Sequence, residues 1–465
     1  MSEKQYRLAS AARGGLLYMR GVPGVALGDR VVVRDHSGRR RNGQVIRTSD
    51  EVVLIQVLEG TDGLDLERTW VRFLDQPFEI EVAPQILGRV FNGVGQPRDG
   101  RPRLLSGLTR NVNGAPVNPA ARAYPREFIQ TGISTIDGLN SLVRGQKLPI
   151  FSGSGLPHNR LAAQIVRQAR LTSEESQFAV VFAAMGVSFN DAEFFRNSFA
   201  ESGVLRNVVM FLNLADEPTI ERLILPRAAL TAAEYLAFER DLHVLVVMTD
   251  MTHYAEALRE VATAKGDVPA RKGYPGYLYS DLAELYERAG RIRERHGSIT
   301  MMPVVSMPSD DITHPIPDLT GYITEGQIVL SRELNNRGIY PPIDVPPSLS
   351  RLMKDGIGKE HTREDHGRVA SQLYACYARA LESRNLASII GSDELSESDQ
   401  EYLAFAEAFE RRFVQQSEDE DRGIIETLNL AWDLLSLLPP PALTRVEPAD
   451  LAKYHRWRGD APKVP

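Results

Sequence analysis

Eight residues, 152 to 159, have the spacing of a nucleotide phosphate loop. They lie between an apolar run, 148–151, and a stretch with helical periodicity. A loop in this position directs backbone N–H groups and a helix N-terminus at anionic oxygens, so phosphate binding is the chemistry that the spacing suggests. The eight residues are Ser152, Gly153, Ser154, Gly155, Leu156, Pro157, His158 and Asn159.

The residue types in this loop do not match the spacing. A working loop reads G-x-x-x-x-G-K-[ST], but here Ser152 and Pro157 replace the two glycines. His158 replaces the lysine, and a mostly neutral imidazole cannot substitute for a permanent cation beside phosphates. Asn159 offers an amide where a metal-binding hydroxyl is needed, and Pro157 removes a backbone donor. The loop is therefore predicted to bind phosphate weakly, and the local pattern alone slightly favours an ordinary strand-to-helix turn.

Two other places in the sequence carry carboxylates that could bind a metal ion. Asp250 follows the apolar run 244–248, as a Mg²⁺-positioning aspartate would, but it has no complete magnesium site to join. The stretch from Asp310 to Asp318 contains aspartates and His314 among prolines, without the ligand spacing of a closed site. We expect interface structure there and predict no metal site.

The elements that would position these residues fall into three parts. Residues 1–72 contain short β-branched runs separated by turn residues, which predicts a small β-barrel or sandwich. Residues 73–347 alternate apolar runs with helical stripes, which indicates a RecA-like α/β domain with a mostly parallel sheet covered on both faces. Residues 348–465 have helical periodicity and predict a helical C-terminal domain.

Finer features are also predicted for the third part and its boundary. The proline-rich segment 341–347 is interpreted as a stiff linker. Ser398 and Glu401 predict a capping box at a helix start. A last helix is expected over 424–438, and the acidic run 418–421 is interpreted as a solvated turn.

The composition limits the functions that remain open. The chain has 465 residues and a formal net charge of -7, which argues weakly against nucleic-acid binding. No apolar run approaches the roughly 20 residues needed to span a bilayer, so a membrane role would require a partner. The polar N-terminus predicts no secretion signal. The single cysteine, Cys376, fits a reducing compartment and is expected to be a small buried residue.

Several long segments resemble the B subunits, or beta chains, of V-type and archaeal-type rotary ATPases. The resemblance is strongest over about 125–360, and the segments that carry it are 128–137, 143–159, 273–279, 287–290, 310–327 and 348–351. The resemblance implies a β-barrel, a RecA-like domain and a helical domain. It also implies a non-catalytic regulatory chain that alternates with catalytic A subunits in an A3B3 ring around a central shaft, with peripheral stalks beside it.

The same resemblance assigns roles to individual residues. It makes Arg351 an arginine finger that reaches the γ-phosphate of a nucleotide held by the neighbouring A subunit. ATP or ADP with Mg²⁺ would then be bound mainly by that partner. The stretch 184–189, which would carry the catalytic glutamate in an A subunit, has no carboxylate until Asp191. The expected location is the cytoplasmic face of a membrane, where the complex couples ATP synthesis or hydrolysis to proton or sodium transport.

Two alternatives remain at this point. A self-sufficient phosphate-loop NTPase would need a lysine where His158 stands. A ring-shaped nucleic-acid motor would need a basic surface, which the acidic balance disfavours.

Overall fold

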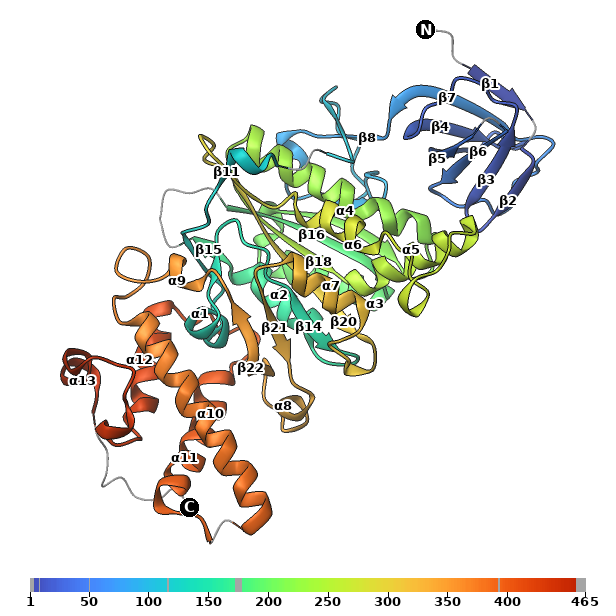
Figure 1. The fold of residues 1–465 in the computed structure, drawn as a ribbon. Helices are drawn as coiled ribbons and strands as arrows, with labels where there is room; N and C mark the ends of the chain where they lie inside the picture. The colour runs from blue at the N-terminus through green and yellow to red at the C-terminus, as the bar shows by residue number, and fades with distance from the viewer. Residues whose placement is uncertain are drawn as a thin grey trace. The chain divides into compact units, whose positions relative to one another are not determined.

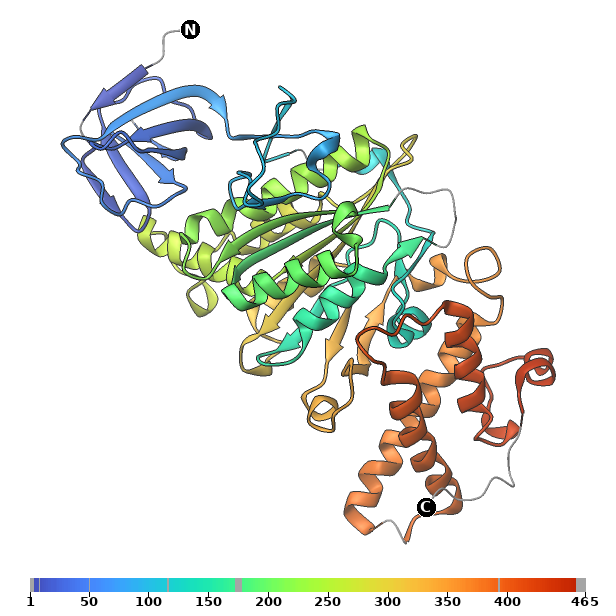
Figure 2. The same cartoon turned by 180° about the vertical axis from the view of Figure 1, so that it is seen from behind.

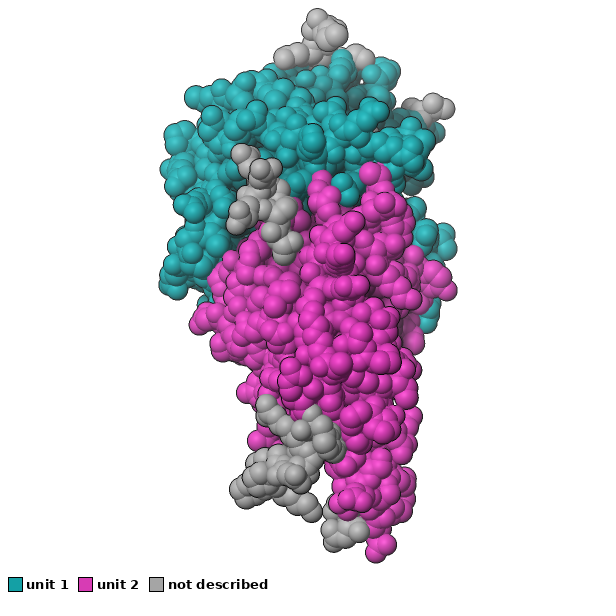
Figure 3. All heavy atoms as spheres, turned by 90° about the vertical axis from the view of Figure 1, so that its left-hand side faces the viewer, with its two compact units in different colours: residues 1–122, 179–299 teal, residues 123–178, 300–465 magenta. Residues whose placement is uncertain are grey.

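The computed structural model describes residues 4–7, 9–49, 51–114, 117–171, 178–391 and 394–456. The chain divides into two compact units, which Figure 3 shows in separate colours. Unit 1 consists of residues 1–122 and 179–299, and unit 2 of residues 123–178 and 300–465. Each unit is therefore assembled from two separate stretches of sequence.

The N-terminal part of unit 1 is a seven-stranded antiparallel sheet in the order β1-β7-β4-β5-β6-β3-β2. Alternate residues such as Val31, Val33, Val71 and Phe73 point into a shared apolar core, as period-2 patterning requires. The sheet is coloured blue in Figure 1. Its strands are β1 (Lys4–Arg7), β2 (Ala11–Arg13), β3 (Leu16–Arg20), β4 (Asp29–Arg34), β5 (Arg40–Thr48), β6 (Val52–Val57) and β7 (Trp70–Pro77). The β-rich prediction for the start of the chain is confirmed.

The rest of unit 1 is α/β. Strands β18, β16, β17 and β9 are neighbours in that order, and the β16–β17 and β17–β9 pairs are parallel. The strands are β8 (Glu79–Glu81), β9 (Val90–Asn92), β10 (Thr109–Asn111), β16 (Phe178–Val187), β17 (Val208–Leu214), β18 (His243–Thr249) and β19 (Gly290–Ile292). The helices are α3 (Phe189–Glu201), α4 (Thr219–Glu234), α5 (Met251–Lys265) and α6 (Leu278–Tyr286).

Unit 2 contains the other half of the α/β elements. Strands β20, β14 and β21 run parallel, and β22 pairs with β21 in the antiparallel sense at the edge. The strands are β11 (Arg122–Ala123, at the unit boundary), β12 (Phe128–Gln130), β13 (Leu142–Val143), β14 (Ile150–Gly153), β15 (Arg170–Leu171), β20 (Ser298–Met307), β21 (Gly326–Leu330) and β22 (Ile343–Ser350). Helices α1 (Ser134–Leu139), α2 (His158–Gln168), α7 (Pro315–Ile323) and α8 (Arg332–Asn336) accompany them.

The remainder of unit 2 is helical, and Figures 1 and 2 show α10 alongside α11 and α12. Cys376 lies in the apolar core of these helices, where burial raises the pKa of its thiol to about 11, so its interpretation as a small buried residue is confirmed. The helices are α9 (Met353–Gly356), α10 (His366–Ile390), α11 (Glu397–Ala408), α12 (Ile424–Leu435) and α13 (Pro448–Tyr454). Among the described residues, none of the helices combines the length and the apolarity that crossing a membrane requires.

Three local predictions are wrong. Segment 341–347 is mostly strand and not a linker, since most of it belongs to β22. Pro346 and Pro347 are tolerated there because β22 is an edge strand with an irregular register, where a missing N–H breaks no ladder. Ser396, not Ser398, caps α11 by accepting a hydrogen bond from the backbone N–H of Asp399. The last helix is α13, whereas α12 ends at Leu435.

Candidate functional site

The phosphate-loop segment has the predicted order of strand, turn and helix. β14 ends at Gly153, and α2 begins at His158 with Pro157 as its N-cap residue. Gly155 has φ +76°, a left-handed conformation that glycine adopts without a steric penalty. The loop therefore keeps the backbone path that its spacing predicts.

Two backbone donors of this loop are used within the loop itself. The N–H of Leu156 donates to the carbonyl oxygen of Gly153 over 3.2 Å. The N–H of His158 donates to the carbonyl oxygen of Leu156 over 2.9 Å. Pro157 has no N–H to offer. Because an anion site needs several N–H groups that converge on one point, this loop is a poor phosphate cradle.

The two ends of the loop are joined by side chains. The buried hydroxyl of Ser152 lies 3.0 Å from Nδ1 of His158. The same hydroxyl donates to the carbonyl oxygen of Gly153 over 3.1 Å, so Nδ1 of His158 is the donor when both bonds are made. His158 is thus hydrogen-bonded to the strand residue Ser152. Both residues stand at positions where the loop departs from a working pattern.

An ion pair that the sequence did not predict lies against the loop. Arg332 donates through Nε and Nη2 to the carboxylate of Asp310, over 2.6 and 2.9 Å, and through Nη2 to the carbonyl oxygen of Ser154, over 2.9 Å. A Cβ atom on Gly153 would lie 2.2 Å from Oδ1 of Asp310, so the pair is packed directly on the loop. Arg332 holds the pKa of Asp310 below its usual value. The positive charge beside this loop is therefore already matched by a carboxylate.

The stretch 310–318 contains no metal-binding arrangement that the described residues reveal. Asp310 is bound to Arg332, and the carboxylate of Asp311 accepts hydrogen bonds from the N–H and hydroxyl of Thr313. These carboxylates therefore fix the local chain, with α7 beginning at Pro315.

Asp250 lies in unit 1 and begins a helix. Its side chain accepts a hydrogen bond of 2.7 Å from the N–H of Thr252, as the N-cap of α5, and it is 3% exposed. Helix capping by aspartate needs no metal ion. Its position directly after β18 is as predicted, and the capping bond gives it a structural role.

The end of β16 carries no carboxylate that could activate water. β16 ends at Val187, and Ser188 caps α3 by accepting a bond from the N–H of Asp191. The hydroxyl of Ser188 also donates to the Asp191 carboxylate over 2.6 Å. The first carboxylate after the strand is thus bonded at a helix start.

Arg351 is exposed and directly follows β22. Its backbone N–H donates to the carbonyl oxygen of Glu325 over 3.0 Å, and its Nη1 donates to the carbonyl oxygen of Thr324 over 3.1 Å. Both partners are neutral, so these contacts orient the guanidinium without neutralising its charge.

The serines before Arg351 fix the strand that carries it. Ser350 is buried, donates to the carbonyl oxygen of Ser141 over 2.8 Å and accepts from Gln146 over 2.9 Å. Ser348 accepts from the N–H of Val329 over 3.0 Å and donates to the carbonyl oxygen of Asp344. Arg351 therefore projects from a rigid strand end, a position that the sequence order alone did not reveal.

The acidic run 418–421 is not simply a solvated turn, which corrects that interpretation. Its four carboxylates form ion pairs with four arginines: Arg160 with Glu418, Arg167 with Asp419 at 3.6 Å, Arg422 with Glu420 at 2.5 Å, and Arg170 with Asp421 at 2.5 Å. Gln164 of α2 also donates to the carbonyl oxygens of Ser417 and Glu420, each over 3.2 Å. The helix that begins at the phosphate loop is thus bonded to residues 417–421.

Family models match three parts of the chain. The β-barrel domain of the ATP synthase alpha/beta family matches residues 10–75, and the nucleotide-binding domain of that family matches residues 132–350. The C-terminal domain of V and A type ATP synthase matches residues 355–455. These matches confirm the predicted fold class and, with the strand–loop–helix segment, define a subunit of the ATP synthase alpha/beta class.

Individual relatives narrow the class. A V-type ATP synthase beta chain from Nitrosococcus oceani is 77% identical over 100% of this chain and 98% of its own. An A-type ATP synthase B subunit from Aeropyrum pernix is 59% identical over 97% of this chain and 98% of its own. A solved ATP synthase subunit, NeqB from Nanoarcheaum equitans, is 40% identical and superposes with a TM-score of 0.73, covering 91% of this chain and 100% of its own. The chain belongs to the family of B subunits, or beta chains, of V-type and A-type ATP synthases.

Proposed function

We propose that this chain is the non-catalytic, regulatory member of an alternating A3B3 ring. Its main chemical contribution is Arg351, which acts as an arginine finger on a nucleotide bound by the neighbouring A subunit. The observation that carries the proposal is the state of that residue: Arg351 is exposed, its Nη1 donates to the carbonyl oxygen of Thr324, and within the described part of the chain its guanidinium has no carboxylate partner. A planar, permanently charged guanidinium with forked donors suits the developing charge on a phosphoryl group.

The chain's own phosphate loop does not fit Mg²⁺ and a triphosphate. His158 is bonded to Ser152, Asn159 supplies no hydroxyl, and the Arg332 guanidinium is paired with Asp310. ATP or ADP with Mg²⁺ is therefore assigned mainly to the A subunit, and no step of the reaction is assigned to residues 152–159 or to Asp250.

Family membership supports a proposed organisation of the complex. We assign residues 1–72 to the barrel, 73–347 to the nucleotide-fold domain and 348–465 to the helical domain. The partners are A subunits, central-shaft and peripheral-stalk subunits, and, indirectly, a membrane sector that translocates protons or sodium ions. The chain then lies at the cytoplasmic face of the membrane, and nucleic acid is not a partner.

The test uses the chain assembled with its A partner. Replacing Arg351 by lysine keeps one positive charge but removes the forked donors, so ATP hydrolysis should fall by a factor of about 10³ or more, within the range known for arginine fingers. The matched control is Arg411→Lys, because Arg411 is an exposed arginine of the same unit whose side chain pairs with Glu407 on the surface. Normal turnover of Arg351→Lys, in a complex whose assembly matches the control, contradicts the proposal.

The purified chain alone separates this proposal from a self-sufficient NTPase. We expect negligible Mg²⁺-ATP hydrolysis without the A subunit, because the loop lacks the lysine and the hydroxyl that the reaction needs. Robust turnover by the lone chain that is abolished by His158→Ala would instead assign catalysis to the chain's own loop.

A further inference from the structure

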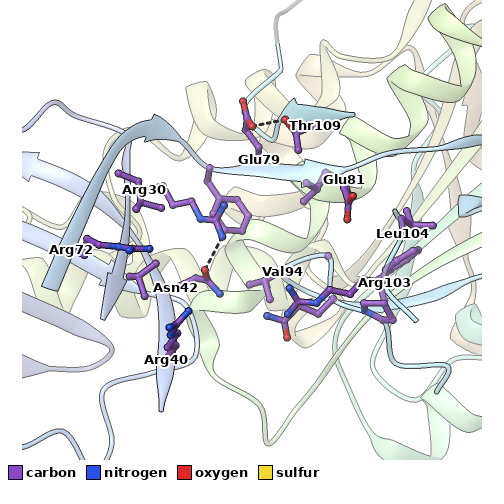
Figure 4. A pocket seen from close by; sticks show the side chains of 18 residues that line it. Arg30, Arg40, Asn42, Arg72, Glu79, Glu81, Val94, Arg103, Leu104 and Thr109 are labelled. Atoms are coloured by element: carbon purple, nitrogen blue, oxygen red, sulfur yellow. Dashed lines mark hydrogen bonds between the residues drawn. The ribbon is translucent and has the colours of Figure 1, made fainter. Parts of the chain in front are cut away.

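A cavity of about 550 Å³ lies entirely within unit 1, between two walls (Figure 4). One wall is formed by strands β4, β5 and β7 of the seven-stranded sheet. The other wall comes from residues 78–109, which follow that sheet in the chain. Binding cavities for small molecules commonly have volumes of about 300–1,000 Å³, so this one has the capacity for a ligand.

The first wall is lined by the outward-facing residues of its strands. Val31, Val33 and Phe73 point into the apolar core, so the alternate residues of the same strands face the cavity. Strand pairing places Val32 opposite both Asn42 and Arg72. The residues of this wall are Arg30, Val32, Arg40, Asn42, Arg72 and Leu74.

Strand register gathers positive charge on this face of the sheet, although Arg34 does not itself line the cavity. Arg34 lies opposite Arg40, and Arg72 is diagonal to both Arg30 and Arg34, because these two flank Val32 on β4. Like charges directly opposite each other, as in the Arg34–Arg40 pair, destabilise a sheet. An anion bound beside these arginines would offset the repulsion between them.

Arg30 is held in place and directed at this cavity. Its Nη2 donates to the side-chain carbonyl of Asn42 over 3.0 Å, and its guanidinium carbon lies 5.7 Å from the ring centre of Phe78. Its Nε is buried, and no hydrogen-bond partner for it occurs in the described parts of the chain. Burial lowers the pKa of Arg30, while the nearby carboxylates of Glu79 and Glu59 act in the opposite direction.

The second wall combines apolar surface with a further cation. Ile80, Phe91, Val94 and Leu104 supply the apolar surface, and Arg103 supplies the charge. Its carboxylates are those of Glu79 and Glu81, and Glu79 accepts a hydrogen bond of 2.6 Å from the hydroxyl of Thr109. The lining therefore carries four arginines against two glutamates, which leaves a positive excess of two charges.

We propose that this cavity is a binding site for a small phosphate-bearing anion, held between Arg72 and its neighbours on the sheet and Arg103 on the opposite wall. Guanidinium groups bind phosphate oxygens through charge-assisted, forked hydrogen bonds. Two facing walls within one unit suit a compact anion that they can surround, and the apolar patch gives room for an organic part of such a ligand. The site is separate from residues 152–159, which belong to unit 2.

The proposal is tested by calorimetric titration of the full chain with inorganic tripolyphosphate at low ionic strength. We expect saturable binding of one anion per chain that weakens as salt is added, because the interaction is electrostatic. Arg72→Gln and Arg103→Gln remove one arginine from each wall, and each should weaken binding at least about tenfold. Circular dichroism and the melting temperature of each variant show whether its fold is retained.

The matched control is Arg47→Gln. Arg47 is an exposed arginine of β5 that does not line the cavity, so its removal takes the same charge from the same sheet. Binding by this variant should stay within about twofold of the parent chain. An equal loss in Arg47→Gln and Arg72→Gln would show diffuse surface attraction and would overturn the proposal, as would the absence of saturable binding by a folded parent chain.

Two further titrations identify the source of the binding. Arg332→Gln at the phosphate loop should leave tripolyphosphate binding unchanged. Loss of tripolyphosphate binding in that variant would assign the site to unit 2 and reject the cavity. A polyglutamate peptide that binds in an Arg72-dependent manner while tripolyphosphate does not would identify an acidic protein segment as the occupant instead. Tighter binding of ATP than of tripolyphosphate, still dependent on Arg72 and Arg103, would add an organic group to the proposed ligand.

Discussion

Arg288 lies within one of the segments that carry the family resemblance, and its side chain is 1% exposed. It donates through Nε and Nη2 to the Glu234 carboxylate, over 2.6 and 2.7 Å. It also donates to the carbonyl oxygen of Val112 over 2.8 Å and to the hydroxyl of Thr231 over 2.9 Å. One buried guanidinium thus joins α4 to the segment around residue 112, and we predict that Arg288→Met loosens this part of unit 1.

The expected cost follows from the charge that the substitution leaves behind. Removing one partner of a buried ion pair costs roughly 3–5 kcal/mol, because the remaining charge is unpaired. The Glu234 side chain is 20% exposed and can recover some hydration, so the lower end of that range, about 3 kcal/mol, is expected. The double variant Arg288→Met/Glu234→Gln should recover much of the loss, since it buries no unpaired charge.

Arg110 and Glu239 provide the control. They form a similar forked pair over 2.8 and 2.7 Å, but their side chains are 38% and 39% exposed. Arg110→Met should therefore cost less than about 1 kcal/mol. Both are forked arginine–carboxylate pairs, but Arg288 is buried and makes further hydrogen bonds, so the comparison contrasts a buried, networked arginine with an exposed one.

Hydrogen exchange of the amides of α4 measures the loss locally. A loss of about 3 kcal/mol corresponds to roughly 100-fold faster exchange where exchange requires opening of the helix. Equal protection in Arg288→Met and Arg110→Met would refute the reasoning. A double variant less stable than Arg288→Met would also refute it, because the unpaired carboxylate would then not be the cause.

Two more predictions concern unit 2. Burial lowers the pKa of His366 to about 4, while Nε2 donates to the carbonyl oxygen of Gly138 over 3.1 Å. The unfolded histidine titrates near 6.5, so the folded state binds the proton less tightly than the unfolded state. The free energy of unfolding is therefore highest above pH 6.5 and falls by about 3 kcal/mol in total as the pH drops towards 4. Urea unfolding followed by Trp432 fluorescence should show this pH dependence of stability in the parent chain and not in His366→Gln. The same pH dependence in both chains would contradict the prediction. Gly153→Ala places a Cβ atom 2.2 Å from Asp310 and should lower the free energy of unfolding by about 1–3 kcal/mol, measured by the same assay. An unchanged unfolding midpoint would show that the Asp310–Arg332 pair moves aside freely.

The strands and the phosphate-loop path were predictable because their signals are local. Residues 31–33 form a β-branched run near a turn, and residues 150–153 are followed directly by a turn and a helical stripe. The resemblance to the family of B subunits was predictable for a different reason, since long runs such as 310–327 are specific to it. Domain boundaries and the arginine finger remain predictions.

The contacts of the site depend on residues far apart in sequence. Nothing near Ser154 indicates that Arg332 binds its carbonyl oxygen, and nothing near Glu418 indicates a pairing with Arg160. Ser396 and Ser398 both precede acidic residues by three positions, so the sequence pattern alone could not select the cap. The cavity arginines were missed because they are spread over three strands and a loop, and only the register brings Arg72 beside Arg30.

The bonds between α2 and residues 417–421 have a mechanical consequence. α2 starts at the phosphate loop, and residue 421 is followed after two residues by α12, which packs in the helical core. Successive turns of α2 make these contacts, through Arg160, Gln164 and Arg167. The helix is therefore held at several points along its length and not at one. A shift of α2 would therefore strain several contacts at once, so these contacts couple the loop end of unit 2 to the segment that leads into its C-terminal helices.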